Sequence, residues 1–164
     1  MTQTDSLLLL PHEQLTLANT HEAAELRRYR RLALSFLPKA PQTSRLMATL
    51  GLQCEKRLDT LRQAARSLEL DACVMALPAG VPRCALNDRH FFIVDDATGN
   101  QVVEQAIRAA VESKNFFEWL VDTNATAELH QPFLSFAREK EGECRVLLEF
   151  WEQHHQSPVR LRQA

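Results

Sequence analysis

The sequence predicts an all-α protein, a four-helix bundle with one long crossover connection between its second and third helices. Glycine is rare, with only four in 164 residues, which disfavours folds that need many tight turns. Apolar residues recur in alternating steps of three and four within four separate segments, the spacing of amphipathic helices. Turn-forming residues gather near the middle of the chain. The length is that of one domain, predicted to span residues 1–164.

The first helix is predicted over residues 11–37. Pro11 is favoured at the first position of a helix, and Pro38 ends the apolar pattern. Two glutamates lie on the otherwise apolar face, whose residues are Leu15, Ala18, Glu22, Glu25, Tyr29, Leu32 and Phe36.

The second helix is predicted over residues 43–69, with Thr43 or Ser44 as its N-cap. A cysteine and an arginine interrupt its inward face, which runs through Met47, Leu50, Cys54, Arg57, Leu61, Ala64 and Leu68. Residues from about 71 to 99 contain several prolines and glycines and are predicted to form the long crossover connection.

The third and fourth helices are predicted over residues 100–121 and 127–153. Each again carries a glutamate among apolar residues. The third helix has Val102, Ala109, Glu112, Phe116 and Trp119 on one face, and the fourth has Leu134, Ala137, Glu141, Cys144, Leu148 and Trp151. An ionised carboxylate in a core is costly, so such a glutamate is either assigned to the wrong face, paired with a cation, or held by a metal.

The order of helices and connections is that of ferritin-like bundles. The segments "THEAAELRRYRRLA", "LGLQCEKRLDTL", "AIRAAVESKNFFEWL" and "PFLSFAREKEGECRVLLEF" together cover most of the chain and resemble the rubrerythrin-like branch of the ferritin-like superfamily. That resemblance implies a di-iron centre and a redox or peroxide-related activity. Carried over by position, Glu22, Glu112 and Glu141 keep the type of a ligand. Cys144 stands where a histidine is expected, while Cys54 and Arg57 replace the ligands of the second helix.

Two hypotheses follow from these residues. In the first, iron or another divalent metal is held by Glu22, Glu112, Glu141 and Cys144 in an oxidoreductase with an unknown electron donor. In the second, no metal is bound and Arg57 neutralises the buried glutamates of a binding or structural module. A guanidinium remains charged inside a protein and forks onto carboxylates, which favours the second hypothesis slightly.

Composition limits the other function classes. The formal net charge is -2 and basic residues are scattered among acidic ones, so no nucleic acid is expected as a partner. The start of the chain lacks the features of a signal peptide and no membrane segment is predicted, so a cytoplasmic location is expected. In that compartment the four cysteines are expected to be free thiols. The family resemblance also implies a homodimer.

Overall fold

The computed structural model describes residues 7–74 and 91–155, and within them four long helices dominate. The helices are α1 (Pro11–Phe36), α2 (Pro41–Ser67), α3 (Asp96–Asp122) and α4 (Ala127–His155), with a short 3-10 helix, η1 (Asp71–Cys73), after α2. These described ranges contain no regular strand. The predicted all-α four-helix bundle is therefore confirmed. None of the helices in them has an apolar stretch long enough to cross a membrane.

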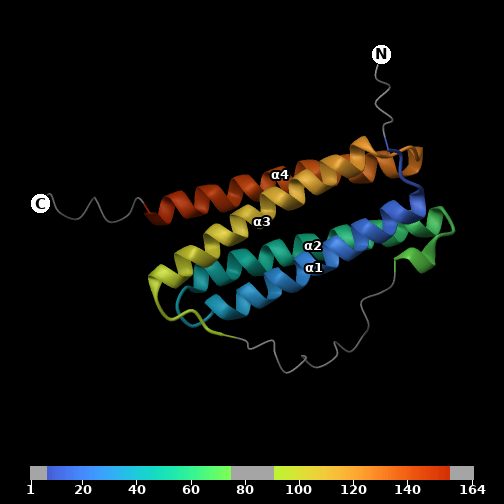
Figure 1. Cartoon of the computed structure of the whole chain (residues 1–164). Coiled ribbons are helices and arrows are strands. Elements are labelled where there is room, and N and C mark those ends of the chain that lie inside the picture. The colour runs from blue at the N-terminus through green and yellow to red at the C-terminus, as the bar shows by residue number, and fades with distance from the viewer. Residues whose placement is uncertain (1–6, 75–90, 156–164) are drawn as a thin grey trace, which may run out of the picture.

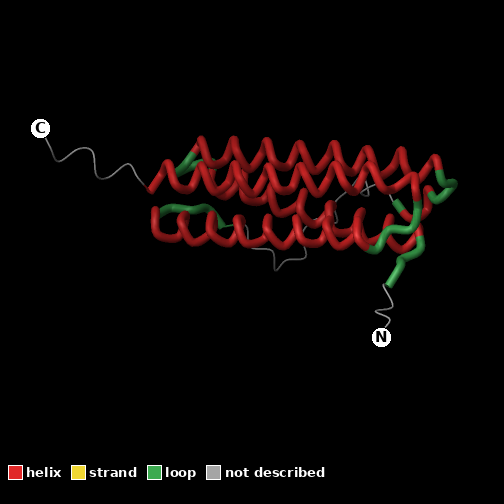
Figure 2. Tube along the Cα trace, turned by 90° about the horizontal axis from the view of Figure 1, so that it is seen from above, coloured by secondary structure: helices red, strands yellow, loops and turns green. Residues whose placement is uncertain are grey.

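The bundle consists of two antiparallel hairpins. α1 packs against α2, and α3 packs against α4 (Figure 1). The hairpins meet where α1 contacts α3 and where α2 contacts α4. The described loops lie at the two ends of the bundle, as the view from above shows (Figure 2).

The second and third helices run parallel, because α2 ends at one end of the bundle and α3 begins at the opposite end (Figure 1). The predicted crossover falls largely on residues 75–90, which lie outside the described residues, so its path stays a prediction. After it, Ile93 is buried, and its backbone N–H donates to the carbonyl of Ser35 at 3.0 Å.

The helix starts differ from prediction in two places. α2 begins at Pro41, so the assignment of Thr43 or Ser44 as its N-cap is wrong. Proline suits the first helical position, and the Ser44 hydroxyl donates to the carbonyl of Ala33 in α1 instead, at 2.5 Å. α3 begins at Asp96, earlier than predicted, because the Asp95 carboxylate caps it by accepting the N–H of Thr98 at 2.7 Å.

The predicted inward face of the first hairpin is confirmed over most of its length. The buried residues of α1 and α2 that lie on it are Leu15, Ala18, Glu22, Glu25, Tyr29, Phe36, Met47, Leu50, Cys54, Arg57 and Leu61. Local apolar spacing was sufficient here because both helices have one apolar stripe with polar residues on either side.

The predicted inward faces of the second hairpin are confirmed at Ala137 and Cys144 of α4 and are wrong by about one residue at the other positions. In α3 the buried side chains include Val103, Ala106, Ala110, Ser113, Phe117 and Leu120, and Glu112 is exposed. In α4 they include Leu129, Phe133, Phe136, Lys140, Glu143, Cys144 and Leu147, and Glu141 is exposed. Apolar residues occupy adjacent positions in α3, as at Phe116 and Phe117, so two faces have similar apolar content. Lys140 and Glu143 are charged, so the true inward face of α4 lacks the continuous apolar pattern from which an inward face is predicted.

The position of α3 can be tested with two aromatic residues. Phe117 has an exposed fraction of 0%, whereas Trp119 is 40% exposed. Phe117→Ala is expected to lower the free energy of unfolding by about 3 to 5 kcal/mol, and Trp119→Ala by clearly less, because only the first change leaves a cavity in the core. Urea unfolding measures both. A larger loss for Trp119→Ala would place the wrong face of α3 inside.

Candidate functional site

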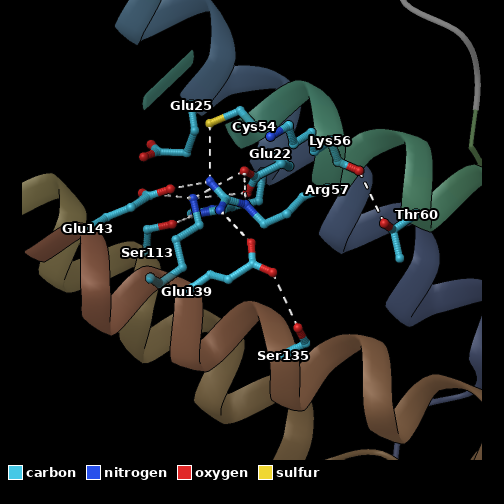
Figure 3. A network of polar contacts seen from close by, with 12 residues as sticks. Glu22, Glu25, Cys54, Lys56, Arg57, Thr60, Ser113, Ser135, Glu139 and Glu143 are labelled. Carbon is cyan, nitrogen blue, oxygen red and sulfur yellow. Dashed lines mark hydrogen bonds and ion pairs between the residues drawn. The ribbon is translucent and has the colours of Figure 1, made fainter. Parts of the chain in front are cut away.

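A single arginine occupies the centre of the bundle. Arg57 comes from α2, and only 1% of its side chain is exposed. Its Nε donates to Glu22 Oε1 at 2.6 Å, and its Nη1 donates to Glu139 Oε2 at 3.0 Å. Its Nη2 donates to Glu143 Oε1 (Figure 3). One guanidinium thus binds carboxylates from α1 and α4.

A buried lysine completes the arrangement. Lys140 of α4 has an exposed fraction of 0%, and its Nζ lies 3.0 Å from Glu22 Oε2 and 3.2 Å from Glu22 Oε1. The same Nζ lies 3.8 Å from Glu143 Oε2, and 5.6 Å from the centre of the Phe117 ring. We call the five charged residues Glu22, Arg57, Glu139, Lys140 and Glu143 the ion-pair network.

Glu22 and Arg57 are held in their charged forms although they lie in the core. Burial raises the pKa of Glu22, but attraction to Lys140 and Arg57 outweighs burial and leaves that pKa below its ordinary value. Burial lowers the pKa of Arg57, but Glu22 and Glu143 raise it by more, so the guanidinium stays protonated. Three carboxylates face two cations, and Glu139 is the member that reaches solvent, with 43% of its side chain exposed.

Polar side chains of α1 and α3 continue the polar region towards the seam between these helices. Glu25 is buried and pairs with Arg28 one turn along α1. Burial raises the pKa of Glu25, and the charge of Arg28 opposes this change. His21 shares a hydrogen bond of 2.8 Å between its Nε2 and Ser113 Oγ, and its ring stacks on Phe116 with 4.2 Å between ring centres.

His21 is held in its neutral form. Burial is the main cause, and the positive charge of Lys140 adds to it, so the pKa falls from 6.5 to about 4. The negative charge of Glu22 opposes this shift, but it is the smaller effect. A neutral imidazole can either donate to or accept from the Ser113 hydroxyl.

The surroundings of the two buried thiols favour the protonated, unreactive form. Cys54 Sγ accepts a hydrogen bond from Arg57 Nη2 at 3.5 Å, but burial and then the charge of Glu22 raise its pKa above the ordinary range. Burial and then Glu143 raise the pKa of Cys144 as well. Cys54, Cys73 and Cys144 are free cysteines, as predicted, and Cys84 lies outside the described residues. A reactive thiol needs positive surroundings that favour the thiolate, and at both buried cysteines burial and a carboxylate outweigh the nearby cations.

The four predicted ligands do not converge. Glu22 lies in the network and Cys144 is buried, but Glu112 and Glu141 are exposed. Glu141 lies 3.7 Å from Arg145 one turn along α4, an exposed pair typical of a solvated helix face. The prediction that Glu112 and Glu141 point into the bundle is therefore wrong, because α3 and α4 are turned from their predicted positions.

The donor set does not fit a divalent metal. Both oxygens of Glu22 lie beside the cations Arg57 and Lys140, which would repel a third positive charge. In residues 7–74 and 91–155, no three His, Cys, Asp or Glu side chains come together in a way that could hold a metal ion. No chemical step at this site is therefore assigned to a metal.

Sequence analysis missed four residues of this region. The sequence did not predict the part that four residues play in this region: Lys140, Glu143, Glu139 and His21. It did predict that Arg57 is a buried cation. Aromatic residues at Phe133 and Phe136 mark the true inward face of α4, and Lys140 lies one turn further along it. A search for opposite charges at that spacing would have found the Lys140–Glu143 pair.

Comparison with known protein families, with curated proteins and with solved structures finds no match to this chain. The site is therefore interpreted from its own geometry.

Removing Arg57 should be severe, because it would leave two buried carboxylates, Glu22 and Glu143, with Lys140 as the one cation between them. Arg57→Ala is expected to lower the free energy of unfolding by about 3 to 5 kcal/mol. The matched control is Arg62→Ala in the same helix, which removes an exposed pair with Asp59 and is expected to cost less than about 1 kcal/mol. Urea unfolding measures both variants. Equal losses would contradict a central role for Arg57.

The neutral state of His21 predicts a specific pH dependence. The pKa of His21 is about 4 in the folded protein and 6.5 ordinarily, so between these values the unfolded chain binds more protons. Stability is therefore full above pH 6.5 and falls as the pH is lowered towards 4. The lowered pKa of Glu22 adds a further loss below 4.5.

Urea midpoints measured from pH 7.5 to 4.5 for wild type and for His21→Gln test this dependence. The variant is expected to lose less stability over this range, while His12→Gln, a change at an exposed histidine, should follow wild type. A parallel decline in all three proteins would show that His21 does not contribute.

Proposed function

We propose that this protein is a metal-free helical bundle that serves as a binding module, with Arg57 and Lys140 neutralising the glutamates in its core. The observation that carries the proposal is the double pairing of Glu22, whose two carboxylate oxygens lie against two different cations. In this proposal the resemblance to rubrerythrin-like proteins concerns the bundle, and iron chemistry is not part of the function.

The charges support this function better than an oxidoreductase. A di-metal centre needs carboxylates and imidazoles that converge on the same space. Here that space holds a guanidinium and an ammonium group, and the only histidine beside it in residues 7–74 and 91–155, His21, bonds to Ser113. Two protein cations balance the inward carboxylates of Glu22 and Glu143, so these glutamates are compensated on an apolar face without a metal.

The side chains around the network also favour binding over catalysis. The thiols of Cys54 and Cys144 have raised pKa values, which removes them as nucleophiles at neutral pH. Burial likewise raises the pKa of the Tyr29 hydroxyl beyond the ordinary range. The network therefore acts as a scaffold element that sets the relative positions of α1, α2 and α4.

Metal analysis tests the proposal directly. Protein purified from iron-supplemented cells is expected to contain far less than one metal per chain, and its urea midpoint should be the same with and without a chelator. Unfolding should also be repeated with added iron, because a metal lost in purification would then raise the midpoint. Stoichiometric iron with a chelator-sensitive midpoint would refute the metal-free function.

A further inference from the structure

The outer face of the first hairpin carries an apolar groove along the seam between α1 and α2. The groove has a volume of about 440 Å³, and the small residues Ala33, Ala48 and Gly51 line it. Leu34 and Leu52 line it as well, yet they are 54% and 55% exposed. The same face therefore offers protruding leucines and a hollow between small side chains.

Charged residues flank this apolar strip on α2. Arg45 precedes Ala48 and Glu55 follows Leu52, and all four side chains reach solvent. Steps of three, four and three residues separate them, which places the four on one face of the helix. Arg30 Nη2 of α1 contacts Glu55 Oε1, and 40% of the Glu55 side chain is exposed. The second oxygen of Glu55 can therefore accept a further donor.

This order of residues is self-complementary when two copies of α2 cross antiparallel, level with Leu50. Ala48 of each copy then faces Leu52 of the other, so that a small side chain receives a large one. Arg45 of each copy faces Glu55 of the other, which brings opposite charges together. A two-fold axis repeats every contact, so each of these pairings occurs twice in the interface.

The exposed face of α3 lacks this property. It carries Glu104, Arg108, Val111, Lys114 and Glu118 at the spacing of one helix face. An antiparallel pairing centred on Val111 would place Glu104 against Glu118 and Arg108 against Lys114 of the other copy. Both contacts join like charges, which oppose association. The order of charges therefore favours the first hairpin over α3 as the place where two copies meet.

The size of the contact sets the expected affinity. The antiparallel register pairs residues 41–59 of α2, a length of about 28 Å at about 1.5 Å per residue, and two helices side by side are about 20 Å wide. Each copy would thus bury about 560 Å², and both together about 1,100 Å², slightly more than the roughly 1,000 Å² that a specific interface needs. Such an area suits a reversible dimer.

We propose that two copies of this chain associate through the outer face of α1 and α2, about a two-fold axis, to form a reversible dimer. Leu34 and Leu52 supply the apolar contact, and the Arg45–Glu55 pairs between copies fix the register. This inference goes beyond the proposed function, because the surface lies outside the core and does not involve the ion-pair network or the presence of a metal.

Analytical ultracentrifugation of the full chain tests the association from about 1 to 300 μM. The mass is expected to rise with concentration from one chain towards two, with a Kd in the micromolar range. A protein that stays monomeric at every concentration would overturn the proposal.

Two charge variants test the register. Arg45→Glu and Glu55→Arg each place like charges at both Arg45–Glu55 contacts, so each alone should weaken the dimer by at least about tenfold. An equimolar mixture of the two variants should associate again, because opposite charges then face each other at both contacts. The matched control is Arg138→Glu, the same change at an exposed position of α4, which should leave the Kd unchanged. A mixture that fails to associate would refute the register.

Two leucine variants locate the apolar contact. Leu52→Ala should weaken the dimer by at least about tenfold, because several methylenes lose their buried position in each copy. Leu148→Ala in α4 is the matched control and should leave the Kd unchanged. These leucines are 55% and 43% exposed in one chain, so both variants should remain folded, which circular dichroism checks. The reverse order of effects would place the interface on the second hairpin and overturn the proposal.

Discussion

The burial of the Arg57 guanidinium constrains the rest of this structure. A cation in a core is stable only if its hydrogen bonds are made and its charge is balanced, and both requirements must be met by side chains from other helices. Glu22 meets them from α1, and Glu139 and Glu143 meet them from α4. Because these carboxylates must reach one planar group, the network sets how far each helix is rotated and shifted.

Lys140 links the same carboxylates a second time. Its contact with Glu22 ties α4 to α1, two helices that belong to different hairpins, and its contact with Glu143 lies within α4. Buried ion pairs are weak sources of net stability, because desolvation offsets much of their attraction, but breaking one is costly. The network therefore contributes more to selecting this arrangement of helices than to the free energy of unfolding.

The centre of the bundle and the seam between α1 and α3 differ in packing. The ion-pair network and large core residues fill the centre, whereas Ala106 and Ala109 of α3 leave a groove beside Arg28. The fold tolerates this local opening because apolar side chains are buried elsewhere along all four helices, and their burial stabilises the bundle.

The sequence by itself determined the four helices and the inward face of the first hairpin. It also identified Arg57 as a buried cation near Glu22, because both lie on clear apolar stripes of α1 and α2. In those helices local periodicity and tertiary packing agree, so the residue spacing was enough.

Only the tertiary structure decided which faces of α3 and α4 point inward. Adjacent apolar residues gave α3 two faces of similar hydrophobicity, and the choice of Ser113 over Glu112 depends on contact with His21. The inward position of Lys140 depends on Glu22, which lies 118 residues away along the chain. A lysine is stable in a core only when such a partner is present, and local sequence carries no record of a partner that folding alone brings near.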